Sequence, residues 1–148
     1  MTIEEKVNGI IDCCIRDISH LNIHYLTEMF SVYVLYNRQS NFYIKRKGVD
    51  VIAIKIDDPF EMWHNFCHEA GHLFLHSTHQ ADMPYTFNMK QEAQAAQFAL
   101  MLMMPEKLIL KHGLYEAQEI ANYFNVPFNM ALKRIELLIE KSRITTYS

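Results

Sequence analysis

Residues 68–72 of this chain read His68-Glu69-Ala70-Gly71-His72, which is the pattern H-E-x-x-H. On an α-helix, residues four apart lie on the same face, about 6 Å apart along the axis. His68 and His72 could then bind one metal ion, at Zn–N distances of roughly 2.0–2.1 Å. Glu69 follows the first ligand and could act as the general base on a water activated by the metal. On a helix, the pattern therefore predicts the metal site of a zinc-dependent hydrolase.

The sequence before the motif predicts that helix. Asp58 can cap its N-terminus, Pro59 suits the first helical position, and Glu61 completes a capping box. We therefore predict a helix over about residues 59–76, which places the H-E-x-x-H motif in its second half.

The remaining pattern predicts a mainly helical α+β fold. A Thr2–Glu5 capping box and apolar residues at a helical period predict a first helix over about residues 3–18. Three segments rich in β-branched and aromatic residues, at 31–36, from 42 and at 49–56, predict a small three-stranded antiparallel sheet before the motif helix. A second, shorter helix is expected near 20–30. After the motif helix we predict a loop at 77–88 and then helices at 89–103, 106–112, 116–124 and 129–141.

Length and composition indicate one domain. The chain has 148 residues, of which 50% are hydrophobic, and only 4 glycines and 4 prolines. We expect residues 1–148 to form a single domain, with a core over about 1–105 and a C-terminal helical part, 106–148, that could bind a partner. Met101, Met103 and Met104 lie close together and are expected to be buried in the core, while a Met-rich surface for a partner is the alternative.

The net charge and the cysteines limit the kinds of partner and the cellular compartment that we expect. A net charge of -3 argues against a generally basic nucleic-acid binder. The cysteines, Cys13, Cys14 and Cys67, are odd in number and two are adjacent, which makes a poor disulfide framework. We therefore expect core or near-core thiols in a reducing cytoplasm. The N-terminus does not resemble a signal peptide, and no run approaches the ~18 apolar residues of a membrane span.

A catalytic zinc site needs a third protein ligand, and other histidines compete for that role. His76 shares a face with His72 but lies two turns, about 12 Å, from His68, so one ion cannot join all three on a regular helix. His64 fails against His72 for the same reason. His64 and His76 are therefore expected to have structural or supporting roles, while His79, beyond the helix, stays open.

Glu92 is the other candidate for the third ligand. It is the only carboxylate between Asp82 and Glu106, and it lies in an alanine-rich segment that could pack closely against the motif helix. A solvated glutamate in the first turn of a helix is an equally good interpretation of the residues alone.

These segments resemble the ImmA/IrrE family of metallo-endopeptidases. Residues 66–76 are similar to the family's motif helix, and its second motif matches Glu92, Ala95, Phe98-Ala99 and the segment 102–105 in order. The resemblance covers roughly residues 20–140, implies a zincin-like core and places the third zinc ligand on Glu92. Ala96 departs from the family, which usually has asparagine there, and this loss of a supporting hydrogen bond could weaken metal binding.

The resemblance implies an antirepressor, a cytoplasmic protease of phages, mobile elements or stress loci that cleaves a helix-turn-helix transcriptional repressor. In that interpretation His68, His72 and Glu92 bind Zn2+ and Glu69 is the catalytic base. His79 and Tyr85 are candidate donors to the oxyanion.

Two other functions remain to be weighed. An antirepressor could bind and sequester the repressor without cleaving it, and the Ala96 departure keeps this alternative open. Residues 119–135 have the rhythm of a helix-turn-helix with Lys133 and Arg134 on its second helix, but the acidic net charge disfavours direct DNA binding.

Overall fold

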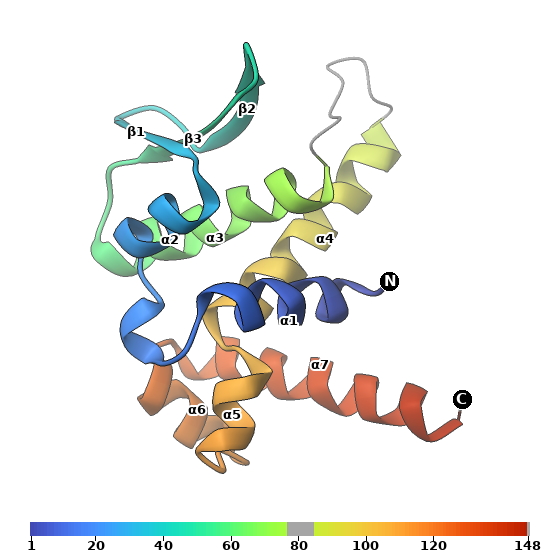
Figure 1. The fold of residues 1–148 in the computed structure, drawn as a ribbon. Coiled ribbons are helices and arrows are strands. Elements are labelled where there is room, and N and C mark those ends of the chain that lie inside the picture. The colour runs from blue at the N-terminus through green and yellow to red at the C-terminus, as the bar shows by residue number, and fades with distance from the viewer. Residues whose placement is uncertain (77–84, 148) are drawn as a thin grey trace.

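The computed structural model describes residues 1–76 and 85–147, which form a helical body with a small sheet at one end (Figure 1). This confirms the mainly helical α+β fold. The strands are β1 (Tyr33–Asn37), β2 (Phe42–Arg46) and β3 (Val49–Lys55). In the described part of the chain the helices are α1 (Ile3–Cys14), α2 (Ile23–Phe30), α3 (Pro59–Leu75), α4 (Tyr85–Met103), α5 (Glu106–Lys111), α6 (Ala117–Phe124) and α7 (Phe128–Tyr147), with a 3-10 turn at Ile18–His20.

The sheet is mixed, so the prediction of a purely antiparallel sheet was wrong. Its order is β1-β3-β2, with β3 parallel to β1 and antiparallel to β2. Lys47 and Gly48 connect β2 to β3 and both have positive φ, as a two-residue type I′ hairpin requires. The segment between β1 and β2 is not a hairpin, because the two strands take opposite edges of β3. Local turn residues do not encode which edge a strand takes, and this is the reason for the error.

Helix α3 is the centre of the fold. It packs against β2 and β3 on one side and against α4 on another, and α1 packs on α4 (Figure 1). The predicted start of α3 is confirmed, because the Asp58 side chain accepts a hydrogen bond of 2.9 Å from the Glu61 N–H. Ile52 of β3, Phe66 of α3 and Phe98 of α4 are fully buried in the shared core, which fixes the helices relative to the sheet.

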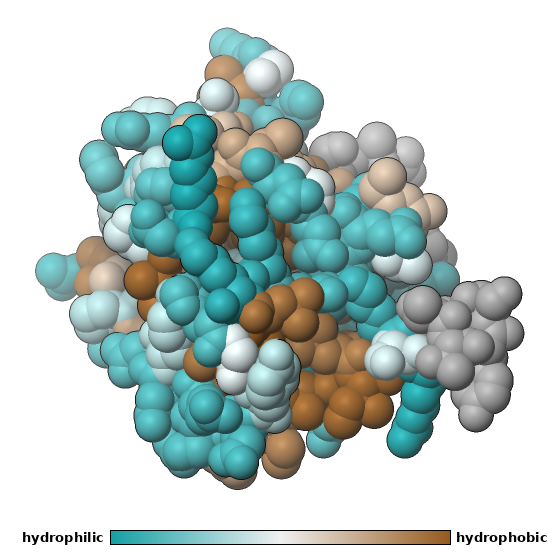
Figure 2. Space-filling model, turned by 60° about the horizontal axis from the view of Figure 1, so that its bottom comes forward, coloured by the Kyte–Doolittle hydropathy of each residue, from teal (hydrophilic) through white to brown (hydrophobic). Residues whose placement is uncertain are grey.

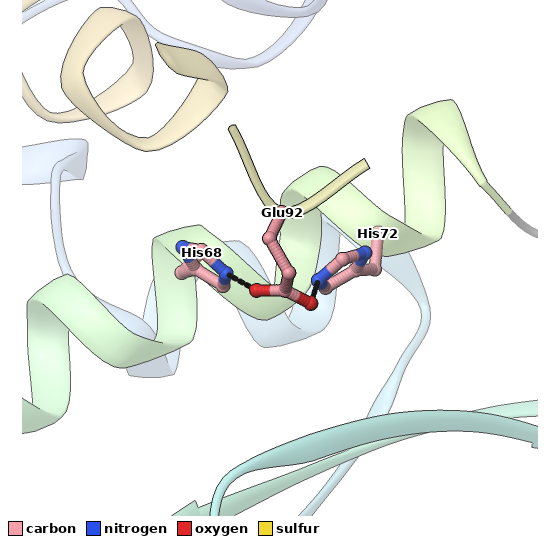
Figure 3. A group of neighbouring side chains, drawn as sticks. All are labelled: His68, His72 and Glu92. Atoms are coloured by element: carbon pink, nitrogen blue, oxygen red, sulfur yellow. Dashed lines mark hydrogen bonds and ion pairs between the residues drawn. The ribbon is translucent and has the colours of Figure 1, made fainter. Parts of the chain in front are cut away.

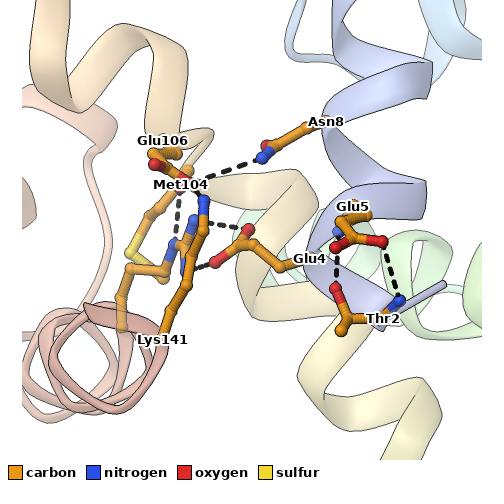
Figure 4. Close-up of polar contacts among 8 residues, drawn as sticks. Thr2, Glu4, Glu5, Asn8, Met104, Glu106 and Lys141 are labelled. Atoms are coloured by element: carbon orange, nitrogen blue, oxygen red, sulfur yellow. Dashed lines mark hydrogen bonds and ion pairs between the residues drawn. The ribbon is translucent and has the colours of Figure 1, made fainter. Parts of the chain in front are cut away.

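The C-terminal helices belong to the same core. Arg134 of α7 is 0% exposed, and its guanidinium donates to both carboxylate oxygens of Glu4, at 2.9 and 3.1 Å, and to the Met104 carbonyl at 2.8 Å. Figure 4 shows Glu4 and Met104 in this cluster, with Asn8, Glu106 and Lys141 nearby. Beside this pair, Glu106 accepts from Asn8 at 3.3 Å and from Lys141 at 2.6 Å. These contacts tie α7 to α1 and to the end of α4.

Of the two cations that the helix-turn-helix interpretation placed on its second helix, Lys133 and Arg134, the second is used in this buried ion pair. Asn125 ends α6 in the left-handed region, with a φ of 56°, where the sequence places the turn. Arg134, however, is buried in its pair with Glu4 and cannot contact a nucleic acid. Helices α6 and α7 therefore close one end of the core.

Several helix boundaries differ from the prediction. Helix α7 continues to Tyr147 rather than 141, and α2 begins at Ile23 rather than near 20. Helix α1 ends at Cys14 rather than near 18, because Ile15 is extended, with a φ of -115°, and its side chain is buried in the core. Helix α4 begins at Tyr85 rather than 89. Residues 88–90 are exposed, so this part of α4 adds no buried face to the core.

The expected core residues are mostly confirmed. Cys67 is fully buried, and Met101, Met103 and Met104 are between 0% and 5% exposed. Cys14 is half-buried, whereas Cys13 is exposed, so the expectation of a core or near-core thiol was wrong for Cys13. Neighbouring residues on a helix point about 100° apart, so Cys13 and Cys14 could not both face the core.

The face that carries the C-terminal helices is largely hydrophilic but includes a patch of apolar side chains (Figure 2). A groove of about 290 Å³ lies here between α5, α6 and α7. Leu110, Tyr115 and Ile139 line it and are 60%, 74% and 47% exposed. Among the described residues, none of the helices has the length and apolar character needed to cross a membrane.

Candidate metal centre

The two motif histidines project from one face of α3 and meet a carboxylate from α4 (Figure 3). His68 Nε2 lies 2.8 Å from Oε2 of Glu92, and His72 Nε2 lies 2.8 Å from Oε1 of the same side chain. Glu92 lies in the second turn of α4 and reaches across between the two rings. Glu92 is therefore not in the first turn of its helix, and its carboxylate contacts both histidines while the side chain stays partly exposed.

These three side chains suit a metal ion. Their ligand atoms all lie within 4.8 Å of one another. Two imidazole nitrogens and one carboxylate oxygen are the protein ligands of a well-known class of catalytic zinc sites, which keep a further position open. The side chain of Glu92 is 54% exposed, while those of His68 and His72 are 23% and 15% exposed, so the cluster opens to solvent on one side. Both the donor set and this opening fit a catalytic zinc.

The protonation states of His72 and Glu92 also favour metal binding. Burial lowers the pKa of His72 below its ordinary value, and the charges of His68 and His76 act in the same direction against Glu92. Burial on its own would raise the pKa of Glu92, but its hydrogen bonds and charge interactions with His68 and His72 outweigh burial and lower it. A neutral imidazole and an ionised carboxylate are the forms that bind a metal.

Glu69 lies on α3 beside the cluster and is 8% exposed. Burial, and secondarily the negative charge of Glu92, raise the pKa of Glu69 to about 7. A carboxyl group with a pKa near neutrality can both accept and return a proton at physiological pH. The placement and the pKa of Glu69 therefore suit a general base.

A cleft of about 300 Å³ gives access to Glu69, His72 and Glu92. Glu69, His72 and Glu92 form one wall, and the start of β2 forms another. The residues that complete the lining are Asn41, Phe42, Tyr43 and Asn88. The sequence did not indicate these residues, because nothing local shows that β2 lies beside the motif helix.

The other sequence candidates are placed as follows. His64 and His76 contribute no atom to the ligand cluster, as their spacing predicted. His76 instead contacts His72 and Gln94, and Gln94 carried no sequence signal, because its partner lies on another helix. His79 and the side chain of Tyr85, the candidate oxyanion donors, lie outside the described residues.

An α+β domain in which two helices join two histidines and a glutamate, beside a buried glutamate and an open cleft, has the architecture of a metallopeptidase-type domain. A family model described as the IrrE N-terminal-like domain, peptidase family M78, matches residues 27–136. The chain belongs to this family, which confirms the resemblance found in the sequence. The matched range includes His68, Glu69, His72 and Glu92. A search of curated proteins found no match for the chain.

Proposed function

We propose that this protein is a zinc-dependent endopeptidase. The observation that carries the proposal is the convergence of His68, His72 and Glu92, whose ligand atoms lie within 4.8 Å of one another. Membership of a peptidase family supports it. The nearly buried Glu69 and the adjoining cleft supply the other two elements that peptide hydrolysis requires, a base and a place for the substrate.

In this proposal each residue has a defined task. His68, His72 and Glu92 hold the zinc, which when bound activates water and polarises the scissile carbonyl. Glu69 accepts a proton at its carboxylate from the attacking water and returns it to the leaving amine. Asn41 and Phe42, at the start of β2, line the same cleft as Glu69 and would contact the substrate there.

We further propose a helix-turn-helix repressor protein as the substrate, so that cleavage relieves repression. This step rests on the resemblance to antirepressor proteases. A peptide must reach Glu69 in extended form, because the cleft is open on one side and measures only about 300 Å³. A flexible linker of the repressor meets that requirement better than a folded domain.

The test begins with metal content. Purified protein is expected to contain about one zinc per chain and to cleave a repressor encoded at the same locus. Glu69→Gln should keep the zinc and lose cleavage, because it removes the base but none of the ligands. Cleavage that survives in this variant would overturn the assignment.

A second function, sequestration of the repressor without cleavage, is favoured by one observation. Ala96 lies one turn after Glu92 on α4 and is exposed, so it offers Glu92 no hydrogen bond where the family has asparagine. Mixing the protein with its repressor separates the two functions. Repressor fragments indicate a protease, and an intact complex indicates sequestration.

A further inference from the structure

A second histidine lies behind His72, on the side of its ring that faces away from Glu92. His72 Nδ1 lies 3.1 Å from His76 Nδ1, and His76 Nε2 lies 2.8 Å from Gln94 Oε1. His76 is only 6% exposed and Gln94 is half-buried. A continuous series of contacts therefore runs from Glu92 on α4, through His72 of α3 and His76 at the C-cap of that helix, and back to Gln94 on α4.

The direction of these hydrogen bonds follows from the ligand atom. His72 faces Glu92 through Nε2, so Nε2 must present its lone pair to a metal. A neutral His72 then carries its proton on Nδ1 and donates it to His76. The Nδ1 of His76 must accept, which leaves the proton of His76 on Nε2. That proton points at Gln94 Oε1, which is an acceptor. Each donor in this series of contacts therefore has an acceptor.

We infer that His76 and Gln94 are positioning residues that fix the tautomer and the ring orientation of His72 for metal binding. The inference rests on the proposed zinc site, which it deepens. Metal-bound histidines typically donate their other ring N–H to such a partner, and loss of the partner weakens metal affinity about 10- to 100-fold. Here the partner is a buried histidine that is itself held by an amide from the helix that carries Glu92.

The arrangement is particular to His72. Within the described residues, Nδ1 of His68 makes no comparable bond to a side chain, and His64, one turn before His68, makes none to the cluster. His64 is half-buried, with its ring centroid 6.0 Å from that of Phe60. His64 therefore provides a matched control for His76. It is also a histidine, and it lies four residues before His68, just as His76 lies four residues after His72.

The test measures zinc affinity directly, by competition with a chromophoric chelator. His76→Leu and Gln94→Met remove an acceptor and are expected to weaken zinc binding about 10- to 100-fold and several-fold, respectively. His64→Leu should leave it within about twofold. His76→Asn, which keeps an acceptor near the position of Nδ1, should recover most of the affinity, and Gln94→Glu should bind at least as tightly as the wild type. Gln94→Met guards against misfolding of His76→Leu, because Gln94 is less buried.

A second readout follows the protons themselves. In the zinc-loaded wild type with 15N-labelled histidine, the nitrogen shifts should place a proton on Nδ1 of His72 and on Nε2 of His76. A merely structural role for His76 predicts no rescue by asparagine and no fixed tautomer. Protonation of His76 at Nδ1 instead would overturn the inference.

The affinities also separate this inference from the proposed function. If the wild type binds no zinc, both fail. If the wild type binds zinc and His76→Leu and Gln94→Met bind it equally tightly, the positioning role is wrong while the zinc site stands.

Discussion

Gly71 of α3 and Ala95 of α4 lie in close contact between the two helices that carry the proposed metal ligands. A Cβ on Gly71 would lie 3.0 Å from the Ala95 Cα, 3.1 Å from its carbonyl oxygen and 3.2 Å from its Cβ. Gly71 directly precedes His72, and Ala95 follows Glu92 by three residues. The distance between the metal ligands therefore depends on the absence of a single methyl group.

Gly71→Ala should separate α3 from α4 by a few tenths of an ångström and move Glu92 away from His72. Because the obstacle is mainly backbone, we expect a loss of stability of about 1–3 kcal/mol and weaker zinc binding, measured by urea unfolding and chelator competition. Gly9→Ala in α1 is the control, because a Cβ there meets nothing within 4 Å. It should stabilise the protein by about 0.5–1 kcal/mol. Equal behaviour of the two variants would contradict the close contact.

Zinc should stabilise the folded protein through Glu92. At a free zinc concentration of 100 times the Kd, the expected gain is about 2.7 kcal/mol, seen as a rise in Tm after zinc is added to chelator-treated protein. Glu92→Gln should lose most of this gain, because it removes a charged ligand. Glu136→Gln, at an exposed glutamate on α7, should keep it. A full zinc response in Glu92→Gln would exclude this residue as a ligand.

The buried carboxyl of Glu69 should make the metal-free protein less stable at high pH. Its folded pKa of about 7 exceeds its ordinary value of 4.5, so the folded state holds the proton more tightly than the unfolded state. The stability from this group is fully present below about pH 4.5 and is lost as the pH rises through 7. At roughly 1.4 kcal/mol per pH unit, the loss is about 3 kcal/mol at most.

Glu69→Gln removes this titration. Metal-free Glu69→Gln should therefore be more stable than the wild type at pH 8, by about 1–3 kcal/mol, and the difference should disappear toward pH 4.5. Urea unfolding of both proteins across this range is the measurement. If the difference in unfolding free energy between the two proteins does not change with pH, ionisation of the buried Glu69 carboxyl does not destabilise the fold.

The ion pair between Glu4 and Arg134 should be sensitive to the loss of either partner. Arg134→Met leaves a carboxylate that is only 6% exposed without its cation, so we expect a loss of about 3–5 kcal/mol in urea unfolding. Replacing both residues with apolar ones should recover much of it. Asp12→Ala breaks the exposed Asp12–Lys107 pair, at 4.0 Å, and should cost less than about 1 kcal/mol. A double variant as unstable as Arg134→Met would contradict this account.

The sequence predicted the motif helix and its ligands because that information is local. Asp58 and Pro59 fix where α3 begins, and the four-residue spacing of His68 and His72 places both rings on one face. Glu92 was harder to assign. Its residue type and the alanines around it allowed both a ligand and a solvated side chain, and only the resemblance to a family favoured the ligand.

Other features depended on contacts between distant segments. The parallel pairing of β1 with β3, the contact of β2 with the cleft and the bond from His76 to Gln94 all join residues on different elements. Local patterns carry no information about such pairings.

The sequence by itself determined the helical character, the start of α3 and the two histidines of the site, since helix caps and periodicity act over a few residues. The tertiary structure alone decided that Glu92 reaches both rings. It does so because Gly71 lets α4 approach α3 closely. Burial in the folded protein also raises the pKa of Glu69, which no local pattern encodes.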